Sequence, residues 1–276
     1  FTAGPSGGTD AADVFNGTSG ADTYDGLGGD DQIHGGAGDD TLSGGRAADQ
    51  IWGDAGSDKL YGGEGDDTID GGDGFDTIYG GRGADAIHGG ADNDTIYYDE
   101  GDDAGGNVVY GDGGDDFIQG GGSLNNRLFG GDGADIIYGN GVIHGDAGND
   151  IINGGDGPVT LYGDDGDDFI GANAGAAIIY GGAGADQIGG GYGDDILNVD
   201  LGDRSVSALS GNDKIFISPA PADESVKLKS IEAGDGADVF VIVAPLGEVI
   251  NLTLDGGAGS DTLDLSRATG TVVVDL

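Results

Sequence analysis

An apolar residue recurs at every ninth position in the first third of the chain, with polar or small residues between. This column contains Phe15, Tyr24, Ile33, Leu42, Ile51, Leu60, Ile69, Ile78, Ile87 and Ile96. Because side chains along a strand alternate between faces, one inward residue flanked by two outward residues makes a minimal strand. Each unit therefore predicts a short strand followed by a turn. Such a unit cannot bury its apolar face alone and must stack on its neighbours.

The turns between these strands share one composition. Residues 62–88 read GGEGDDTID, GGDGFDTIY and GGRGADAIH, which is Gly-Gly-x-Gly-x-Asp followed by x-Ile-x. Paired glycines are typical of a backbone that takes positive φ or approaches another group closely. A disordered Gly/Asp-rich tract would have no reason to keep an aliphatic residue in phase. The pattern therefore favours an ordered repeat.

This nonapeptide resembles the calcium-binding repeat of RTX, or hemolysin-type, proteins. The resemblance implies an all-β fold, a right-handed parallel β-roll or β-helix in which two units form a coil of about 18 residues. Successive strands would fall on opposite sheets, with calcium between stacked turns. Eleven such coils would extend on the order of 50 Å.

Calcium takes six to eight oxygen ligands, and the resemblance assigns them to the aspartate at the sixth position and to glycine carbonyls. The aspartates are Asp13, Asp22, Asp31, Asp40, Asp49, Asp58, Asp67, Asp76, Asp85, Asp94, Asp116, Asp135, Asp150, Asp168, Asp186, Asp195, Asp213, Asp238 and Asp261. The carbonyls are those of Gly35, Gly36, Gly38, Gly62, Gly63, Gly65, Gly71, Gly72, Gly74, Gly80, Gly81, Gly83, Gly181, Gly182, Gly184, Gly256, Gly257 and Gly259. Roughly 15–20 ions are expected.

For any one aspartate the alternative is a turn residue bonded to its own backbone. For the off-phase Asp39, Asp66, Asp102 and Asp115, we expect a solvated charge.

The pattern changes after an insertion at residues 98–106. The inward column resumes at Val109 and continues to Leu197, then more weakly to Ile215. Every second sixth position has now lost its carboxylate: Asn107, Asn126, Gly141, Val159 and Ala177. If alternate turns lie on opposite edges, one edge keeps its calcium ligands here. The other edge is held by tight turns or by another surface, or is simply free of calcium.

The outward residue before each inward one changes in the same region. It is mostly Thr, Gln or Lys up to Ile96, and then becomes apolar: Val108, Phe117, Ile136, Val142, Ile151, Phe169, Ile178 and Ile196. Monomers rarely expose so much contiguous apolar surface. We expect self-association through residues 108–196, unless the carboxy-terminal region folds back over a face.

Three regions are expected. Residues 1–12 form a loosely ordered leader, and residues 13–217 form the calcium-binding roll, regular over 13–97 and irregular over 98–198. Residues 218–276 form a wider-coil β extension or a cap, because a solenoid needs an atypical end. The chain starts at Phe1, contains no Met and shows no signal peptide. We therefore expect a processed piece or an ordered part of a longer protein.

The charge and composition of the chain argue against several kinds of binding partner and metal site. Acidic residues number 52 against 9 basic ones, for a net charge of −43, which disfavours nucleic acid and anionic membranes. There is no Cys, and no apolar run is long enough to span a bilayer. The scarcity of Glu argues against EF-hands. His34, His88 and His144 are several coils apart, too far to share one zinc ion.

Motifs of catalysis are missing from the sequence. There is no His-Glu-x-x-His and no phosphate-binding loop, and the GPSGG at 4–8 lacks the flanking strand and helix of a nucleophile elbow. We expect no enzyme activity and no cofactor besides calcium. The favoured function is a calcium-dependent, secreted extracellular structural protein, such as a surface-layer, filament or adhesin component. The resemblance implies bacterial type I secretion. The alternative is a folding and secretion module of a larger secreted protease or lipase.

Overall fold

The computed structural model describes residues 7–98, 105–121, 123–221, 228, 230–243 and 252–268. All regular structure in these residues is β-strand. The chain divides into two compact units, Phe1–Ile143 and His144–Leu276, which are described separately. The described residues contain no helix long and apolar enough to cross a membrane.

The strands are short and follow one another through tight turns. Those that begin in the first unit are β1 (Val14–Asn16), β2 (Thr23–Asp25), β3 (Gln32–Ala37), β4 (Thr41–Arg46), β5 (Gln50–Ala55), β6 (Lys59–Glu64), β7 (Thr68–Asp73), β8 (Thr77–Arg82), β9 (Ala86–Ala91), β10 (Thr95–Tyr97), β11 (Val108–Gly113), β12 (Phe117–Gln119), β13 (Arg127–Asp132) and β14 (Ile136–Ala147). Those of the second unit are β15 (Ile151–Asp165), β16 (Phe169–Gly171), β17 (Ala177–Ala183), β18 (Gln187–Gly189), β19 (Ile196–Asp200), β20 (Ser205–Ser207), β21 (Lys214–Ser218), β22 (Ser230–Glu232), β23 (Asp235–Gly236), β24 (Val239–Ile242), β25 (Thr253–Asp255), β26 (Ala258–Gly259) and β27 (Thr262–Asp264).

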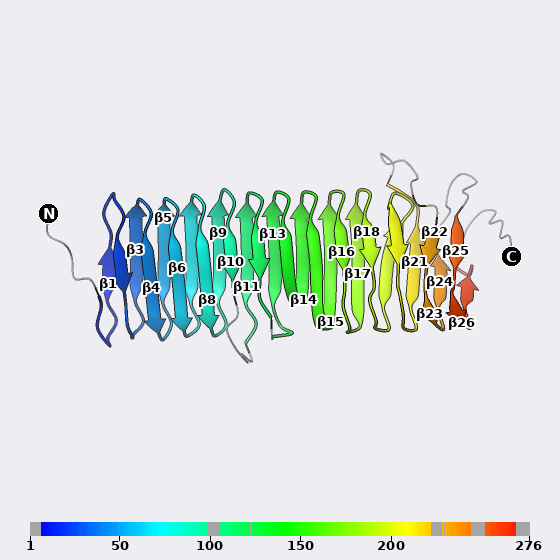
Figure 1. Cartoon of the computed structure of the whole chain (residues 1–276), viewed down its shortest axis with the longest axis horizontal. Helices are drawn as coiled ribbons and strands as arrows, with labels where there is room; N and C mark the ends of the chain where they lie inside the picture. Colours follow the sequence, from blue (N-terminus) through cyan, green and yellow to red (C-terminus); the bar gives the residue numbers. More distant parts are fainter. Residues whose placement is uncertain are drawn as a thin grey trace. The chain divides into compact units, whose positions relative to one another are not determined.

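From β1 to β12 each strand pairs in parallel with the second strand after it. β3 pairs β5 with Ile33 opposite Ile51, and β5 pairs β7 with Ile51 opposite Ile69. β4 pairs β6 in the same way, with Leu42 opposite Leu60. Partners are two nine-residue units apart, so alternate strands build opposite sheets. β3, β5, β7 and β9 follow one another along one of them, and β4, β6 and β8 follow one another along the other (Figure 1). This confirms the predicted all-β parallel solenoid with two units per coil.

The predicted inward column is the core. From Ile33 to Ile96 each of its residues has no exposed surface, and the same holds for Val109, Ile118, Leu128 and Ile137. Identical or similar aliphatic side chains stack on their counterparts in the next coil. Full burial of such a side chain contributes about 1.5–3 kcal/mol. No single nine-residue unit obtains this stabilisation without its neighbours.

The second unit keeps the parallel register and then widens its coils. Ile152 lies opposite Ile170, a spacing of 18 residues, whereas Ile215 lies opposite Phe240, which is 25 residues later. Phe240 in turn lies opposite Leu263, 23 residues later. The described part of 230–264 thus adds further coils. The apolar run 271–274, residues 249–251 of the apolar run 249–254, and residues 1–6 of the expected leader lie outside the described residues.

Candidate calcium sites

The sixth-position aspartates of the first unit form two rows, one along each edge of the coils. Row A contains Asp22, Asp40, Asp58, Asp76, Asp94, Asp116 and Asp135, and row B contains Asp13, Asp31, Asp49, Asp67 and Asp85. In each row, carboxylate atom Oδ1 accepts a hydrogen bond from the backbone N–H of the aspartate one coil earlier. The Asp40 to Asp58 bond is 2.7 Å long, and the Asp49 to Asp67 bond is 2.8 Å. One oxygen of each carboxylate therefore joins two adjacent coils by a hydrogen bond.

In most of these carboxylates, and in several of the second unit, the second oxygen, Oδ2, has no such partner. It is buried without a hydrogen bond in Asp31, Asp40, Asp49, Asp58, Asp67, Asp76, Asp94, Asp116, Asp168, Asp195, Asp213 and Asp238. A buried anionic oxygen that receives no hydrogen bond is strongly disfavoured unless a cation pairs with it. The arrangement recurs in many successive coils, as expected for a row of cation sites.

The first glycine of each turn makes room beside this oxygen. A Cβ added to Gly53 would collide with Asp58 Oδ2 and with the carbonyl oxygen of Gly71 in the next coil. Gly62 stands in the same relation to Asp67 Oδ2 and the Gly80 carbonyl. Carboxylate and carbonyl oxygens thus face one space that only glycine leaves open. Hard oxygen donors of this kind are the ligands that calcium prefers.

The glycines named from the sequence fall into two groups. First-position carbonyls, such as those of Gly71, Gly80 and Gly181, face the space beside an aspartate Oδ2. Carbonyls at the second and fourth positions lie against the matching glycine of the next coil, as with Gly63 beside Gly81, where φ is 100°. A side chain at Gly81 would be strained there. The first-position carbonyls are therefore the ones that share a space with the carboxylates.

Burial and mutual repulsion perturb these carboxyl groups. Burial raises the pKa of Asp67 to about 7; the backbone N–H of Asp49 opposes this shift and the charge of Asp85 adds to it. Burial likewise raises the pKa of Asp116 and of Asp168 to about 8. Without a cation these groups resist ionisation near neutral pH. A bound calcium ion would favour the ionised form instead.

The ends of the rows differ from the middle. Asp13 and Asp22 are half-buried, and their Oδ2 atoms accept hydrogen bonds of 2.6 Å from the backbone N–H groups of Thr9 and Thr18. The threonine hydroxyls add bonds of 2.9 Å. In the second unit, Asp261 ends the series Asp195, Asp213, Asp238 and Asp261 and is exposed. These aspartates therefore lack the buried, unpaired oxygen that marks the inner sites.

Asparagine continues row B in the first unit without its charge. Asn107 Oδ1 accepts from the Asp85 N–H at 2.7 Å, and Asn126 Oδ1 accepts from the Asn107 N–H at 2.9 Å. Both side chains are fully buried. The amide keeps the coil-to-coil bond and removes the anionic oxygen. This part of the edge is thus held from within by the same hydrogen-bond pattern.

Apolar side chains replace the aspartates on one edge of the second unit. Val159 and Ala177 lie in register and are almost completely buried. The atom nearest to a Cβ on Gly154 would be Val159 Cγ2 at 3.0 Å, where other turns place an aspartate Oδ2. Packing fills the space that a cation would occupy. Carboxylates return at Asp195, whose Oδ1 accepts from the Ala177 N–H at 2.7 Å.

Sequence reasoning missed Asp203, which is one residue out of phase. It is buried, and a Cβ on Gly181 would lie 2.7 Å from Asp186 Oδ2 and 3.4 Å from Asp203 Oδ1. Burial, together with the charges of Asp186 and Asp200, raises its pKa to about 9. The turn explains its position, because Asp203 Oδ2 accepts from the Asp200 N–H at 2.8 Å. The carboxylates of Asp186 and Asp203 thus face one buried space at the end of the series Asp150, Asp168 and Asp186.

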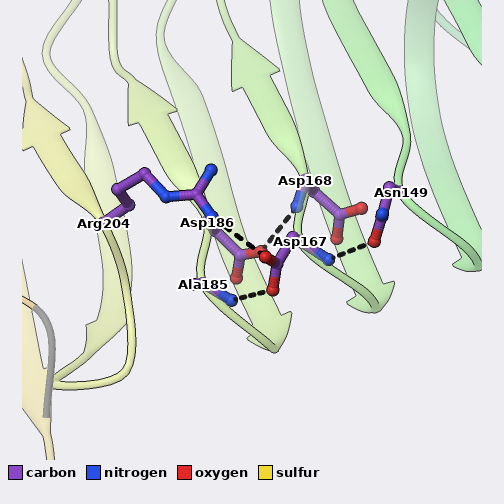
Figure 2. A network of polar contacts seen from close by, with 6 residues as sticks. All are labelled: Asn149, Asp167, Asp168, Ala185, Asp186 and Arg204. Atoms are coloured by element: carbon purple, nitrogen blue, oxygen red, sulfur yellow. Dashed lines mark hydrogen bonds and ion pairs between the residues drawn. The ribbon is translucent and has the colours of Figure 1, made fainter. Parts of the chain in front are cut away.

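The off-phase aspartates are exposed, as expected, but they also bond to the backbone. Asp66 Oδ1 accepts from the Ala84 N–H at 2.9 Å, and Asp39 and Asp115 accept equivalent bonds. In Figure 2 Asp167 repeats this contact with Ala185 at 2.9 Å, and its other oxygen pairs with Arg204 at 2.9 Å. Arg204 therefore supplies a positive charge to the exposed Asp167, next to the buried series Asp150, Asp168 and Asp186. Asp102 lies outside the described residues.

This geometry defines a class of protein, a parallel β solenoid whose turns hold calcium. A family profile described as RTX calcium-binding nonapeptide repeat (4 copies) matches residues 7–141, 144–206 and 253–270 in overlapping segments. The chain belongs to this family, and its repeats with stacked aspartates bind many calcium ions. RTX repeats are typical of secreted bacterial proteins. A search of characterised proteins found no match.

Proposed function

We propose that this chain is an extracellular structural protein that folds on binding calcium and then associates with further copies of itself. The phased aspartates and first-position glycine carbonyls would hold the ions. In the metal-free chain, the buried carboxylates repel one another, and the glycine-rich backbone has a large conformational entropy to lose. Type I secretion would carry the unfolded chain from low cytosolic calcium into calcium outside the cell.

The observation that carries self-association is the apolar outer surface of the second unit. Ile151 and Phe169 are neighbours in register and are 41% and 52% exposed. On the other sheet Ile178 and Ile196 are neighbours in register, each 36% exposed. Among the described residues, the segment after 217 extends the coils by strand pairing and leaves these four side chains exposed.

A second copy is the partner that suits these faces. Calcium neutralises the carboxylates that would otherwise keep two highly acidic chains apart. Each Ile or Phe buried at a contact contributes about 1.5–3 kcal/mol, so a few suffice to offset part of the cost of association. Surface-layer, filament or adhesin assembly would use such a contact.

Light scattering coupled to size exclusion, in calcium and in chelator, tests this function. We expect assemblies in calcium that disappear with Ile151→Asp plus Phe169→Asp, or with Ile178→Asp plus Ile196→Asp. Thr77→Asp plus Thr95→Asp is the matched control, since these residues are also neighbours in register at the same repeat position. A wild-type chain that stays monomeric in calcium at high concentration would refute self-association and favour a folding module of a larger secreted enzyme.

A further inference from the structure

A second kind of metal-ligand cluster lies on the outer surface of the second unit. His144 and Asp146 are on β14, with the buried Gly145 between them, so both side chains leave the same outer face. Asp164, on β15, completes the cluster. All three side chains are half-buried, and their ligand atoms lie within 4.8 Å of one another.

The imidazole in this cluster is held in a fixed orientation. His144 Nδ1 is 2.8 Å from Asp164 Oδ2. The ring also stacks on Tyr162, with centroids 4.3 Å apart and planes 2° from parallel. Stacking and the contact to Asp164 together direct Nδ1 toward the Asp164 carboxylate. A ligand oriented in this way loses little side-chain entropy when it binds an ion.

The other two histidines provide an internal comparison. His34 pairs with Asp54 at 3.5 Å and His88 pairs with Asp112 at 2.8 Å, and each ring stacks on an aromatic neighbour. Two residues after each of these histidines the chain has glycine, Gly36 and Gly90, where the His144 strand has Asp146. Within the described residues, only the His144 cluster brings three potential ligands together.

We propose that His144, Asp146 and Asp164 bind one divalent transition-metal ion, with Zn²⁺ as the representative, independently of the calcium rows. One imidazole nitrogen with two carboxylates suits zinc and its neighbours, whereas calcium takes oxygen ligands. In tetrahedral coordination, ligand bonds of about 2.0–2.2 Å place neighbouring ligand atoms about 3.3–3.6 Å apart. The ligand atoms of the cluster, which lie within 4.8 Å of one another, would draw closer by about 1 Å on binding the ion. Three protein ligands leave a further position for water.

The backbone of the site allows a mild substitution. Asp146 has φ of 67° and Asp164 has φ of 68°. Glycine adopts this left-handed conformation without strain, so Asp146→Gly removes one ligand and reproduces the arrangement at His34 and His88. His144→Phe keeps an aromatic ring to stack on Tyr162 and removes the nitrogen.

The test is zinc titration of the full chain saturated with calcium, followed by calorimetry and by NMR of the imidazole groups. The chain has 3 histidines, so single substitutions assign every imidazole signal. We expect zinc to shift the His144 signals selectively. His144→Phe should lose one bound zinc ion, and Asp146→Gly should weaken it by about tenfold or more. His34→Phe and His88→Phe should bind as the wild type does.

Circular dichroism in calcium verifies that each variant is folded, and Asp146→Gly carries the test if His144→Phe is not. Undiminished zinc binding by Asp146→Gly would overturn the proposal. So would equal losses in the His34, His88 and His144 variants, because zinc would then be binding to single histidine–aspartate pairs. The calcium-dependent fold is measured separately in the same samples, so it does not decide this outcome.

Discussion

The backbone N–H of Asp49 donates a 2.8 Å hydrogen bond to Oδ1 of Asp67, while Oδ2 of Asp67 is buried without a hydrogen bond. The two oxygens of one carboxylate thus have different roles. Oδ1 joins adjacent coils, and Oδ2 faces the space that we assign to calcium. Asn107 and Asn126 show that the first role survives when the charge is removed.

Two substitutions of Asp67 should distinguish the hydrogen bond made by Oδ1 from the calcium binding assigned to Oδ2. Asp67→Asn keeps an acceptor for the Asp49 N–H and removes the anionic oxygen, so it should raise the calcium concentration needed for folding. Asp67→Ala should have a larger effect, because it also loses a hydrogen bond worth about 1 kcal/mol. Calcium titration followed by circular dichroism measures both midpoints.

Asp66→Asn is the control for these variants. It removes the same charge from the adjacent, exposed residue and keeps an acceptor for the Ala84 N–H. The midpoint should move much less than with Asp67→Asn. Equal midpoints for the two variants would show that the sixth position has no special role in binding calcium.

Glycine at the first turn position should matter through space rather than backbone conformation. In Gly53→Ala the new methyl would meet Asp58 Oδ2 and the Gly71 carbonyl oxygen. Overpacking of this kind costs about 1–3 kcal/mol, and it displaces two oxygens that share the proposed calcium space. We expect a higher calcium midpoint and a lower melting temperature in calcium.

Gly20→Ala is the matched control, because a Cβ at Gly20 meets no atom within 4 Å. Its calcium midpoint and its melting temperature should be close to those of the wild type. If Gly53→Ala behaves as Gly20→Ala does, the first-position glycine does not shape the site.

The parallel register could be predicted from the sequence because it depends on one repeated residue. Ile51 must lie opposite Ile69 if each coil buries one aliphatic side chain per unit, and the strand pairing shows this. The loss of Asp at Val159 was also visible. That Val159 Cγ2 fills the vacated space depends on how the turn closes, which the spacing of residues does not report.

The missed residues share a cause. Asp203 is one position out of phase, and only the turn bonded through the Asp200 N–H brings its carboxylate beside Asp186. Asp146 reads as an ordinary turn residue until the strand places it near His144 and Asp164. Repeat phase predicts what recurs in every coil, whereas these sites occur once.

Acid should stabilise the calcium-free fold. The pKa values of Asp67, Asp76 and Asp94 are raised by burial from 3.8 to about 7 in the folded chain. The folded state therefore binds more protons than the unfolded state between these values. The stability that these groups contribute without calcium is greatest below about pH 4 and is lost as the pH rises through about 7.

In chelator, the β signal in circular dichroism should increase as the pH falls from about 8 toward 5. Calcium binding should show the opposite pH dependence and weaken as the pH falls, because protons compete with calcium for the same carboxylates. The calcium midpoint should therefore rise as the pH falls. A calcium-free chain that loses β structure on acidification would contradict the sign of these pKa shifts.

Asp203 gives the last prediction, since it tests a ligand outside the repeat. Its carboxylate and that of Asp186 face one buried space, and burial, together with the charges of Asp186 and Asp200, raises the pKa of Asp203 to about 9. Near neutral pH without calcium the group is protonated, so Asp203→Asn should leave the calcium-free chain almost unchanged. In calcium the variant lacks a second anionic ligand at this end, and its calcium midpoint should rise.

Asp194→Asn is the control, because Asp194 is exposed and its acceptor for the Asn212 N–H is retained. Equal effects of the two substitutions would assign Asp203 to the turn alone, whereas a selective effect at Asp203 would extend the calcium sites beyond the phased aspartates.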